Sequence, residues 1–114
     1  MTTYQQGDIV VVNFPFTDMS KTKTRPVLTL SNATINQTGD CLMVQITSQF
    51  NLDGLSLPIA VEDFTGPVLP LISYVRVHKI FLLNESLIDR RFSRINPTFR
   101  LTVAELLLTY VRWL

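Results

Sequence analysis

Short apolar runs, separated by turn signals, fill most of this chain of 114 residues. The runs are rich in Val, Ile, Leu, Phe and Thr, which favour β-strands, and they cover residues 8–14, 26–31, 41–47, 57–62 and 74–83. Clusters of turn residues lie between them, at 36–40, 51–54 and 66–70. Short strands joined by turns at this spacing predict a small and largely antiparallel barrel.

The end of the chain has the pattern of a helix. Asn96 followed by Pro97 is typical of an N-cap with proline in the first helical turn. Apolar residues then recur at helical spacing, at Phe99, Val103, Leu106, Leu107, Tyr110 and Leu114. A shorter helix is expected around residues 85–91. The prediction is a single domain over residues 1–114, mainly β with a C-terminal helix (α+β).

Composition restricts the class of protein. A hydrophobic content of 46% with 17% charged residues excludes a disordered chain. No apolar run approaches the ~20 residues of a membrane helix, and the N-terminus has no signal-peptide pattern. A cytoplasmic protein without membrane contact is therefore expected. Cys41 is the single cysteine, and no Cys/His spacing resembles a zinc site, so neither a metal nor a cofactor is expected.

The charges are distributed unevenly along the chain. Net charge is only +1, which argues against a non-specific nucleic-acid binder. Residues 71–114, however, carry seven Lys/Arg against three Asp/Glu, whereas residues 1–70 carry three against six. The excess in the C-terminal part favours an anionic partner, with an ordinary solvated surface as the alternative.

One arginine lies where a basic loop meets an apolar strand. Residues 17–24 are almost all polar and include Lys21 and Lys23; Arg25 then precedes the strand that begins at Pro26. Arginine carries a planar, permanently charged fork that suits phosphate. The position predicts an anion-binding residue, and RNA is the anion that we favour.

Two further polar candidates lie in or at the end of later strands. Alternation along residues 41–47 places Thr47, which precedes Ser48, on the same face as Gln45. His78 alternates with Val77 and is expected to point away from the core. No acid pair, phosphate-binding glycine loop or activated cysteine accompanies them. The residues alone therefore predict a small barrel with an anion-seeking arginine.

Four segments, in this order, resemble the MazF/PemK toxin family. They are Gly7–Val12 with Phe14–Phe16, then Arg25–Leu28, Gln45–Ser48 and Ser73–Phe81. Each is short, but their order and spacing together are specific, and the match runs from residue 7 to about residue 90. The resemblance implies a compact SH3-like antiparallel barrel with a C-terminal helix, usually a homodimer.

The resemblance also implies a metal-independent endoribonuclease that cuts single-stranded RNA, typically mRNA, at short sequences. A cognate antitoxin would keep such a toxin inactive by covering the RNA groove. The active-site arginine of the family matches Arg25, and its active-site threonine matches Thr47. The residues expected to bind substrate are Lys21, Lys23, Gln45, Ser48, Arg76 and His78.

Other interpretations remain open. Relatives often have aspartate where this chain has His78, which is either a neutral surface substitution or a group that titrates near neutral pH. A protein-binding module on the same barrel, like the gyrase-poisoning toxins, would act through the C-terminal helix, but Arg25 and Thr47 favour the ribonuclease. A catalytically silent relative is a third interpretation. Leu101 and Leu108, outside the main apolar stripe, indicate either a dimer interface or deeper packing.

Overall fold

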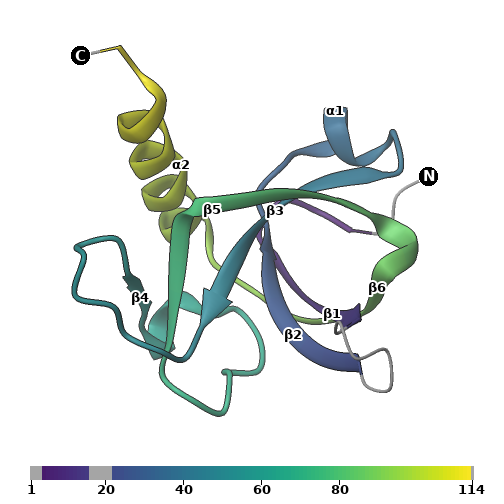
Figure 1. Cartoon of the computed structure of the whole chain (residues 1–114), viewed down its shortest axis with the longest axis horizontal. Coiled ribbons are helices and arrows are strands. Elements are labelled where there is room, and N and C mark those ends of the chain that lie inside the picture. The colour runs from purple at the N-terminus through teal and green to yellow at the C-terminus, as the bar shows by residue number, and fades with distance from the viewer. Residues whose placement is uncertain (1–3, 16–21, 114) are drawn as a thin grey trace.

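A computed structural model describes residues 4–15 and 22–113 of the chain. Six strands form one antiparallel sheet in the order β4-β5-β3-β2-β1-β6, curled into a half-barrel (Figure 1). The strands are β1 (Asp8–Pro15), β2 (Thr22–Thr29), β3 (Asp40–Thr47), β4 (Leu57–Ile59), β5 (Ser73–Asn84) and β6 (Ile88–Arg94). The predicted fold, mainly antiparallel β with a C-terminal helix, is confirmed.

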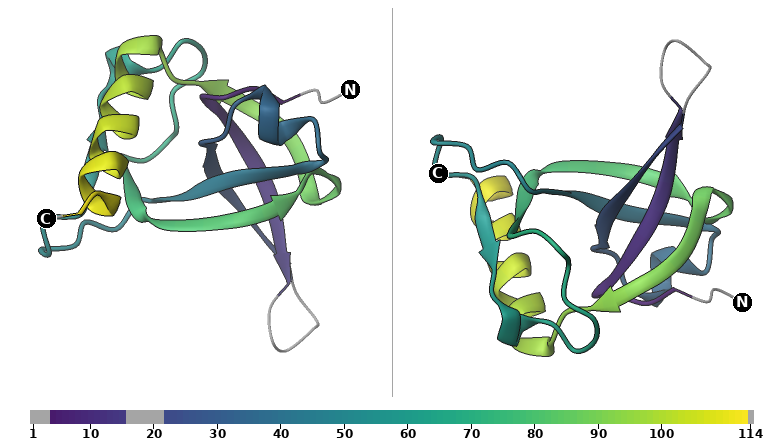
Figure 2. Two further views of the ribbon diagram at one scale, coloured as in Figure 1. Left: turned by 90° about the horizontal axis from the view of Figure 1, so that it is seen from above. Right: turned by 90° about the horizontal axis from the view of Figure 1, so that it is seen from below.

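The C-terminal helix α2 (Pro97–Val111) begins at the predicted residue. The side-chain oxygen of Asn96 accepts a hydrogen bond from the Phe99 amide at 2.7 Å, as an N-cap residue does. A second, short helix, α1 (Ala33–Asn36), was not predicted. Figure 2 shows the two helices on opposite sides of the half-barrel.

The prediction of a helix at residues 85–91 is wrong. Only a 3₁₀ turn, η2 (Glu85–Leu87), forms there, and the chain continues as β6, which pairs with β1. Pairing on both sides removes β1 from the sheet edge, and this tertiary gain overrides a weak helical preference. The strand expected at 57–62 is likewise shorter, because η1 (Val61–Asp63) replaces its end.

The apolar core lies on both faces of the central strands. Alternation sends Ile9 and Leu28 to a first core cluster beneath α2, and their neighbours Val10 and Val27 to a second cluster. Phe99 and Val103 of α2 complete the first cluster. Burial on both faces explains why residues 9–12 are all apolar. A strand with one face in solvent would instead alternate apolar and polar residues.

Strand β5 turns sharply where it passes α2 (Figure 1). Gln45 of β3 pairs with Arg76, but its neighbour Val44 pairs with Ile80, so residues 77–79 form an irregular bulge in the ladder. Bulges of this kind bend a strand and change the direction of its side chains. This bend determines which residues of β5 reach the candidate site.

Candidate active site

Arg25 lies on β2, opposite Val12 of β1. Residues two apart in a strand share a face, so Arg25 lies on the face of Val27, which is buried in the second core cluster. Arg25 itself is exposed, and no carboxylate of the described residues forms an ion pair with it. Within the described part of the chain, the Arg25 guanidinium thus has no carboxylate partner and is exposed where the core meets solvent.

Thr47 is the last residue of β3, the strand next to β2. Val27 pairs with Gln45, so the next residues on the same face towards this end of the two strands are Arg25 and Thr47. The hydroxyl of Thr47 accepts a hydrogen bond from the Gln49 amide at 3.1 Å, which leaves its own proton available for donation. Arg25 and Thr47 therefore lie on one face of neighbouring strands, one step beyond the last paired residues, Val27 and Gln45.

A pocket of about 230 Å³ adjoins this face. Its lining combines two cations, one amide and an apolar wall: Arg25, Pro26, Val27, Gln45, Ile46, Lys79, Ile80 and Phe81. No acidic side chain is among these described lining residues. A pocket with this lining suits a ligand that has both an anionic group and a flat apolar part.

Lys79 is absent from the residues that the sequence predicts for the site. Strict alternation along β5 gives no reason to select it, because only the bulge at 77–79 brings it to the pocket. His78, in the same bulge, is exposed and does not line the pocket. A strand bend of this kind has no clear signal in a single sequence.

Arg76, predicted to bind substrate, is buried and already bonded within the protein. Its Nη1 lies 2.8 Å from Oδ1 of Asp53 and its Nη2 lies 2.7 Å from Oδ2, and Nη1 also donates to Ser56 at 3.1 Å. The hydrogen bond from Arg76 lowers the pKa of Asp53 well below its usual range, and the same bond raises the pKa of Arg76. The pair anchors the loop between β3 and β4 beside Thr47.

Of the other predicted substrate-binding residues, two are placed near Arg25 or Thr47 and two are not placed. Gln45 is half-buried in the pocket wall, and Ser48 is exposed directly after Thr47. Lys21 lies outside the described residues, and of Lys23 in β2 only the backbone is described, paired with Phe14 of β1. The structure thus places Gln45 and Ser48 beside the arginine and threonine, and it leaves the two lysines unplaced.

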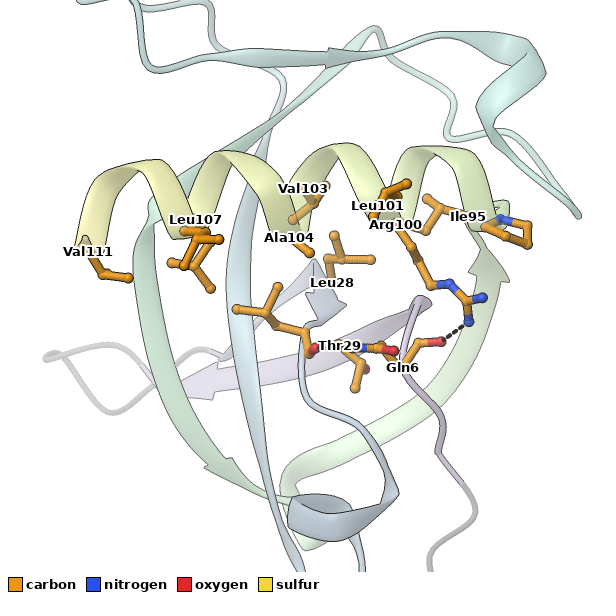
Figure 3. A pocket seen from close by; sticks show the side chains of 13 residues that line it. Gln6, Leu28, Thr29, Ile95, Arg100, Leu101, Val103, Ala104, Leu107 and Val111 are labelled. Carbon is orange, nitrogen blue, oxygen red and sulfur yellow. Dashed lines mark hydrogen bonds between the residues drawn. The ribbon is translucent and has the colours of Figure 1, made fainter. Parts of the chain in front are cut away.

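A larger pocket, of about 570 Å³, lies away from Arg25, between α2 and β2. Figure 3 shows apolar side chains of α2 along it, including Leu101, Ala104 and Leu107, and Leu28 below them. Its one cation, among the described lining residues, is Arg100, which donates to the Gln6 carbonyl at 3.3 Å (Figure 3). This apolar groove contains none of the predicted site residues.

Two findings concern metals and membranes. In the part of the chain that the structure describes, no group of three or more His, Cys, Asp or Glu residues is arranged to hold a metal ion. The described helices also lack the combined length and apolar character that a membrane span requires.

A comparison of this sequence with known protein families shows which family it matches. The model of the PemK-like, MazF-like toxins of type II toxin-antitoxin systems matches residues 5–111. The chain belongs to this toxin family. The resemblance drawn from the four sequence segments is therefore confirmed.

Solved structures of MazF toxins have the same fold as this PemK-like chain. A MazE–MazF structure from Deinococcus radiodurans aligns with a TM-score of 0.78 at 19% identity, covering 97% of each chain. The Mycobacterium tuberculosis toxin MazF-mt6 aligns at 0.70 and 16% identity, covering 93% of this chain and 99% of that one. A mycobacterial endoribonuclease solved with its cognate antitoxin aligns at 0.69 and 19%, covering 98% and 100%. No curated protein matches the sequence.

Proposed function

We propose that this toxin is a metal-independent endoribonuclease that cleaves single-stranded RNA, typically mRNA, at short sequences. The observation that carries the proposal is that Arg25 and Thr47 share one face of the neighbouring strands β2 and β3, and that Arg25 lines a pocket whose described lining is cationic and apolar. Membership of the MazF/PemK family and the similarity to a mycobacterial endoribonuclease support it.

The proposed reaction breaks the RNA chain by internal attack. The 2′-oxygen of one ribose forms a bond to the adjacent phosphorus while the bond from phosphorus to the 5′-oxygen breaks. The 2′-hydroxyl loses its proton and the departing 5′-oxygen gains one, so the products are a 2′,3′-cyclic phosphate and a 5′-hydroxyl. DNA, which lacks the 2′-hydroxyl, is inert in this reaction.

Arg25 and Thr47 stabilise the charge that develops on the phosphate. The guanidinium supplies two parallel donors and the threonine hydroxyl a third. Removing one donor of this kind from an enzyme typically costs about 3–4 kcal/mol in the transition state. A guanidinium remains protonated at neutral pH, so in this proposal Arg25 acts as an electrostatic clamp or an acid rather than as a base.

The remaining predicted residues take supporting roles in the proposal. Gln45 and Ser48 contact the RNA beside Thr47, and the two lysines Lys21 and Lys23 attract its backbone. Arg76 acts through the loop that it anchors, because both of its terminal nitrogens are bonded to Asp53. His78, exposed on the bulge, contacts RNA outside the pocket.

The test of this function is incubation of the purified chain with a long single-stranded RNA in EDTA, beside DNA of the same sequence. We expect discrete cuts in the RNA, RNA fragments that end in a cyclic phosphate, and intact DNA. A folded, antitoxin-free protein that makes no cuts would contradict the proposal. Cuts that require an added divalent metal would also contradict it.

We also propose two protein partners, a cognate antitoxin and a second copy of the chain. The antitoxin is proposed because the similar toxins from Deinococcus radiodurans and from mycobacteria were solved in complexes with MazE or a cognate antitoxin. The second copy is proposed because Leu101, Leu108 and Val111 of α2 are each more than half exposed. Apolar side chains gathered in this way are typical of an interaction surface.

A second candidate function is a protein-binding module that acts through α2. The apolar groove between α2 and β2 favours it, because a groove of this lining accepts an apolar segment of another protein. The RNA assay separates the two candidates, since a binding module would leave the RNA intact while still binding its protein target.

A further inference from the structure

We infer that Phe50 and Tyr74 form a stacking platform for one base of the RNA, next to the phosphate held by Arg25. The two rings lie 5.4 Å apart between centroids, with an angle of 56° between their planes. Phe50 is 57% exposed, so its ring presents a large accessible surface while it contacts the ring of Tyr74. This inference rests on the proposed ribonuclease function and specifies what its site would recognise.

The position of Tyr74 connects this ring pair to the candidate active site. Tyr74 lies on β5 directly opposite Thr47 of β3, and residues paired in this way share a face. Gln45, two residues before Thr47 on the same face, pairs with Val27 of β2 and lines the pocket together with Arg25. Tyr74 and Thr47 thus lie on the same face as Gln45, which connects the ring pair to the pocket that Arg25 lines.

The loop that carries Phe50 is held in place by the protein itself. Asp53, three residues further along, is bound at both carboxylate oxygens by the buried Arg76. Ser56 accepts hydrogen bonds from Arg76 at 3.1 Å and from the Asn51 amide at 3.4 Å. Because hydrogen bonds within the protein hold the loop, a base that stacks on Phe50 need not order the loop first.

The chemistry of this surface favours a nucleobase over an apolar protein segment. Proteins that bind single-stranded RNA commonly stack its splayed bases on aromatic rings. Arg25 and Lys79 supply positive charge in the pocket whose wall includes Gln45, two residues before Thr47, and the charge of Asp53 is balanced by Arg76. An exposed ring combined with exposed cations matches the alternating bases and phosphates of RNA.

The experiment first maps one wild-type cut site on a long RNA. A short RNA containing that site is then made with a 2′-deoxy sugar at the cut nucleotide, which prevents cleavage, and with 2-aminopurine in place of a flanking base. The inference predicts that the wild-type protein quenches 2-aminopurine fluorescence at one flanking position, because stacking on an aromatic ring quenches this base.

Three variants make the test specific. Phe50→Ala and Phe50→Leu should bind the RNA about 5- to 150-fold more weakly and lose the quenching, because each removes one stacked base. Both should also relax the base preference at that flanking position. Leu52→Ala is the matched control, since Leu52 is 94% exposed in the same loop, and it should bind as the wild type does.

The outcomes separate this inference from the proposed function. If the wild type cuts RNA but both Phe50 variants bind and quench as it does, the platform is overturned, the ribonuclease stands, and the exposed ring serves a protein partner. If the Phe50 variants bind RNA weakly but the wild type does not quench 2-aminopurine, the ring acts by ordering the loop, and stacking is overturned. If the wild type neither cuts nor binds RNA, the proposed function fails and the inference fails with it.

Discussion

Arg76 and Asp53 form a two-point ion pair that joins β5 to the loop between β3 and β4, with N–O distances of 2.8 and 2.7 Å. The Arg76 side chain is only 7% exposed, whereas that of Asp53 is 43% exposed. The buried guanidinium is therefore the fixed partner, and the loop carboxylate closes onto it. Through this pair the loop keeps its place beside Thr47 and Tyr74.

Asp53→Asn is expected to loosen the loop without unfolding the sheet. The amide cannot accept two charge-assisted hydrogen bonds, so amide hydrogen exchange in residues 50–56 should become faster. The proposed RNA cleavage should fall by up to about 100-fold, because small displacements of a positioning group reduce rates by that order. Asp89→Asn, at a surface pair with Arg90, is the control and should change neither quantity. Unchanged exchange in the loop would show that the ion pair does not anchor it.

Low pH should abolish the stability that Asp53 gives the wild type over the Asp53→Asn variant. The hydrogen bond from Arg76 holds the pKa of Asp53 below the ordinary value of about 3.9. A carboxyl whose folded pKa is lowered stabilises the fold above its unfolded pKa, and this stabilisation is lost as pH falls through the folded pKa. The stability difference between wild type and Asp53→Asn should thus be constant above about pH 5 and shrink below about pH 4. Urea unfolding at several pH values measures it; a difference that persists undiminished at low pH would contradict the assignment.

The junction of α2 with the sheet should depend on Phe99. This side chain is 5% exposed in the first core cluster. Phe99→Ala should reduce the free energy of unfolding by about 3–5 kcal/mol, since truncation of a buried aromatic leaves a cavity. Leu101→Ala, on the exposed side of the same helix, should change it by less than about 0.5 kcal/mol in the monomer. Urea denaturation compares them, and equal losses would contradict the burial pattern.

The exposed apolar side of α2 should govern self-association. Leu108 and Val111 are 61% and 65% exposed, beside the apolar groove that both line. Leu108→Asp should therefore shift the light-scattering mass from two chains to one at micromolar concentration, while circular dichroism remains unchanged. A wild type that already has the mass of one chain at this concentration would remove the proposed dimer.

The sequence predicts the strands better than their boundaries. Alternation and turn residues locate five of the six strands, and the Asn96–Pro97 signal locates the start of α2. Residues 88–94 were not predicted as a strand, because the gain that favours β6 is its pairing with β1, which is distant in sequence. Propensity over a short window does not contain that information.

The candidate site likewise contains residues that the sequence predicts and residues that only the fold brings to it. Arg25 and Thr47 follow from local pattern and family resemblance, but β2 begins at Thr22 rather than at Pro26, so Arg25 lies within the strand, on the same face as Thr47. Lys79 and the ring pair of Phe50 with Tyr74 could not be predicted, since a bulge in β5 and an anchored loop place them. Arg76 shows the opposite case, in which a basic residue predicted to bind RNA is instead bonded to Asp53.

The most direct test of the account replaces Arg25. The initial rate of RNA cleavage in EDTA would be compared among the wild type, Arg25→Ala and Arg90→Ala, an exposed arginine of β6 that serves as the control. We predict that Arg25→Ala lowers the rate at least about 100-fold with the fold intact, as loss of a transition-state donor does, and that Arg90→Ala cuts normally. Cleavage by a folded Arg25→Ala protein at the wild-type rate would contradict the account.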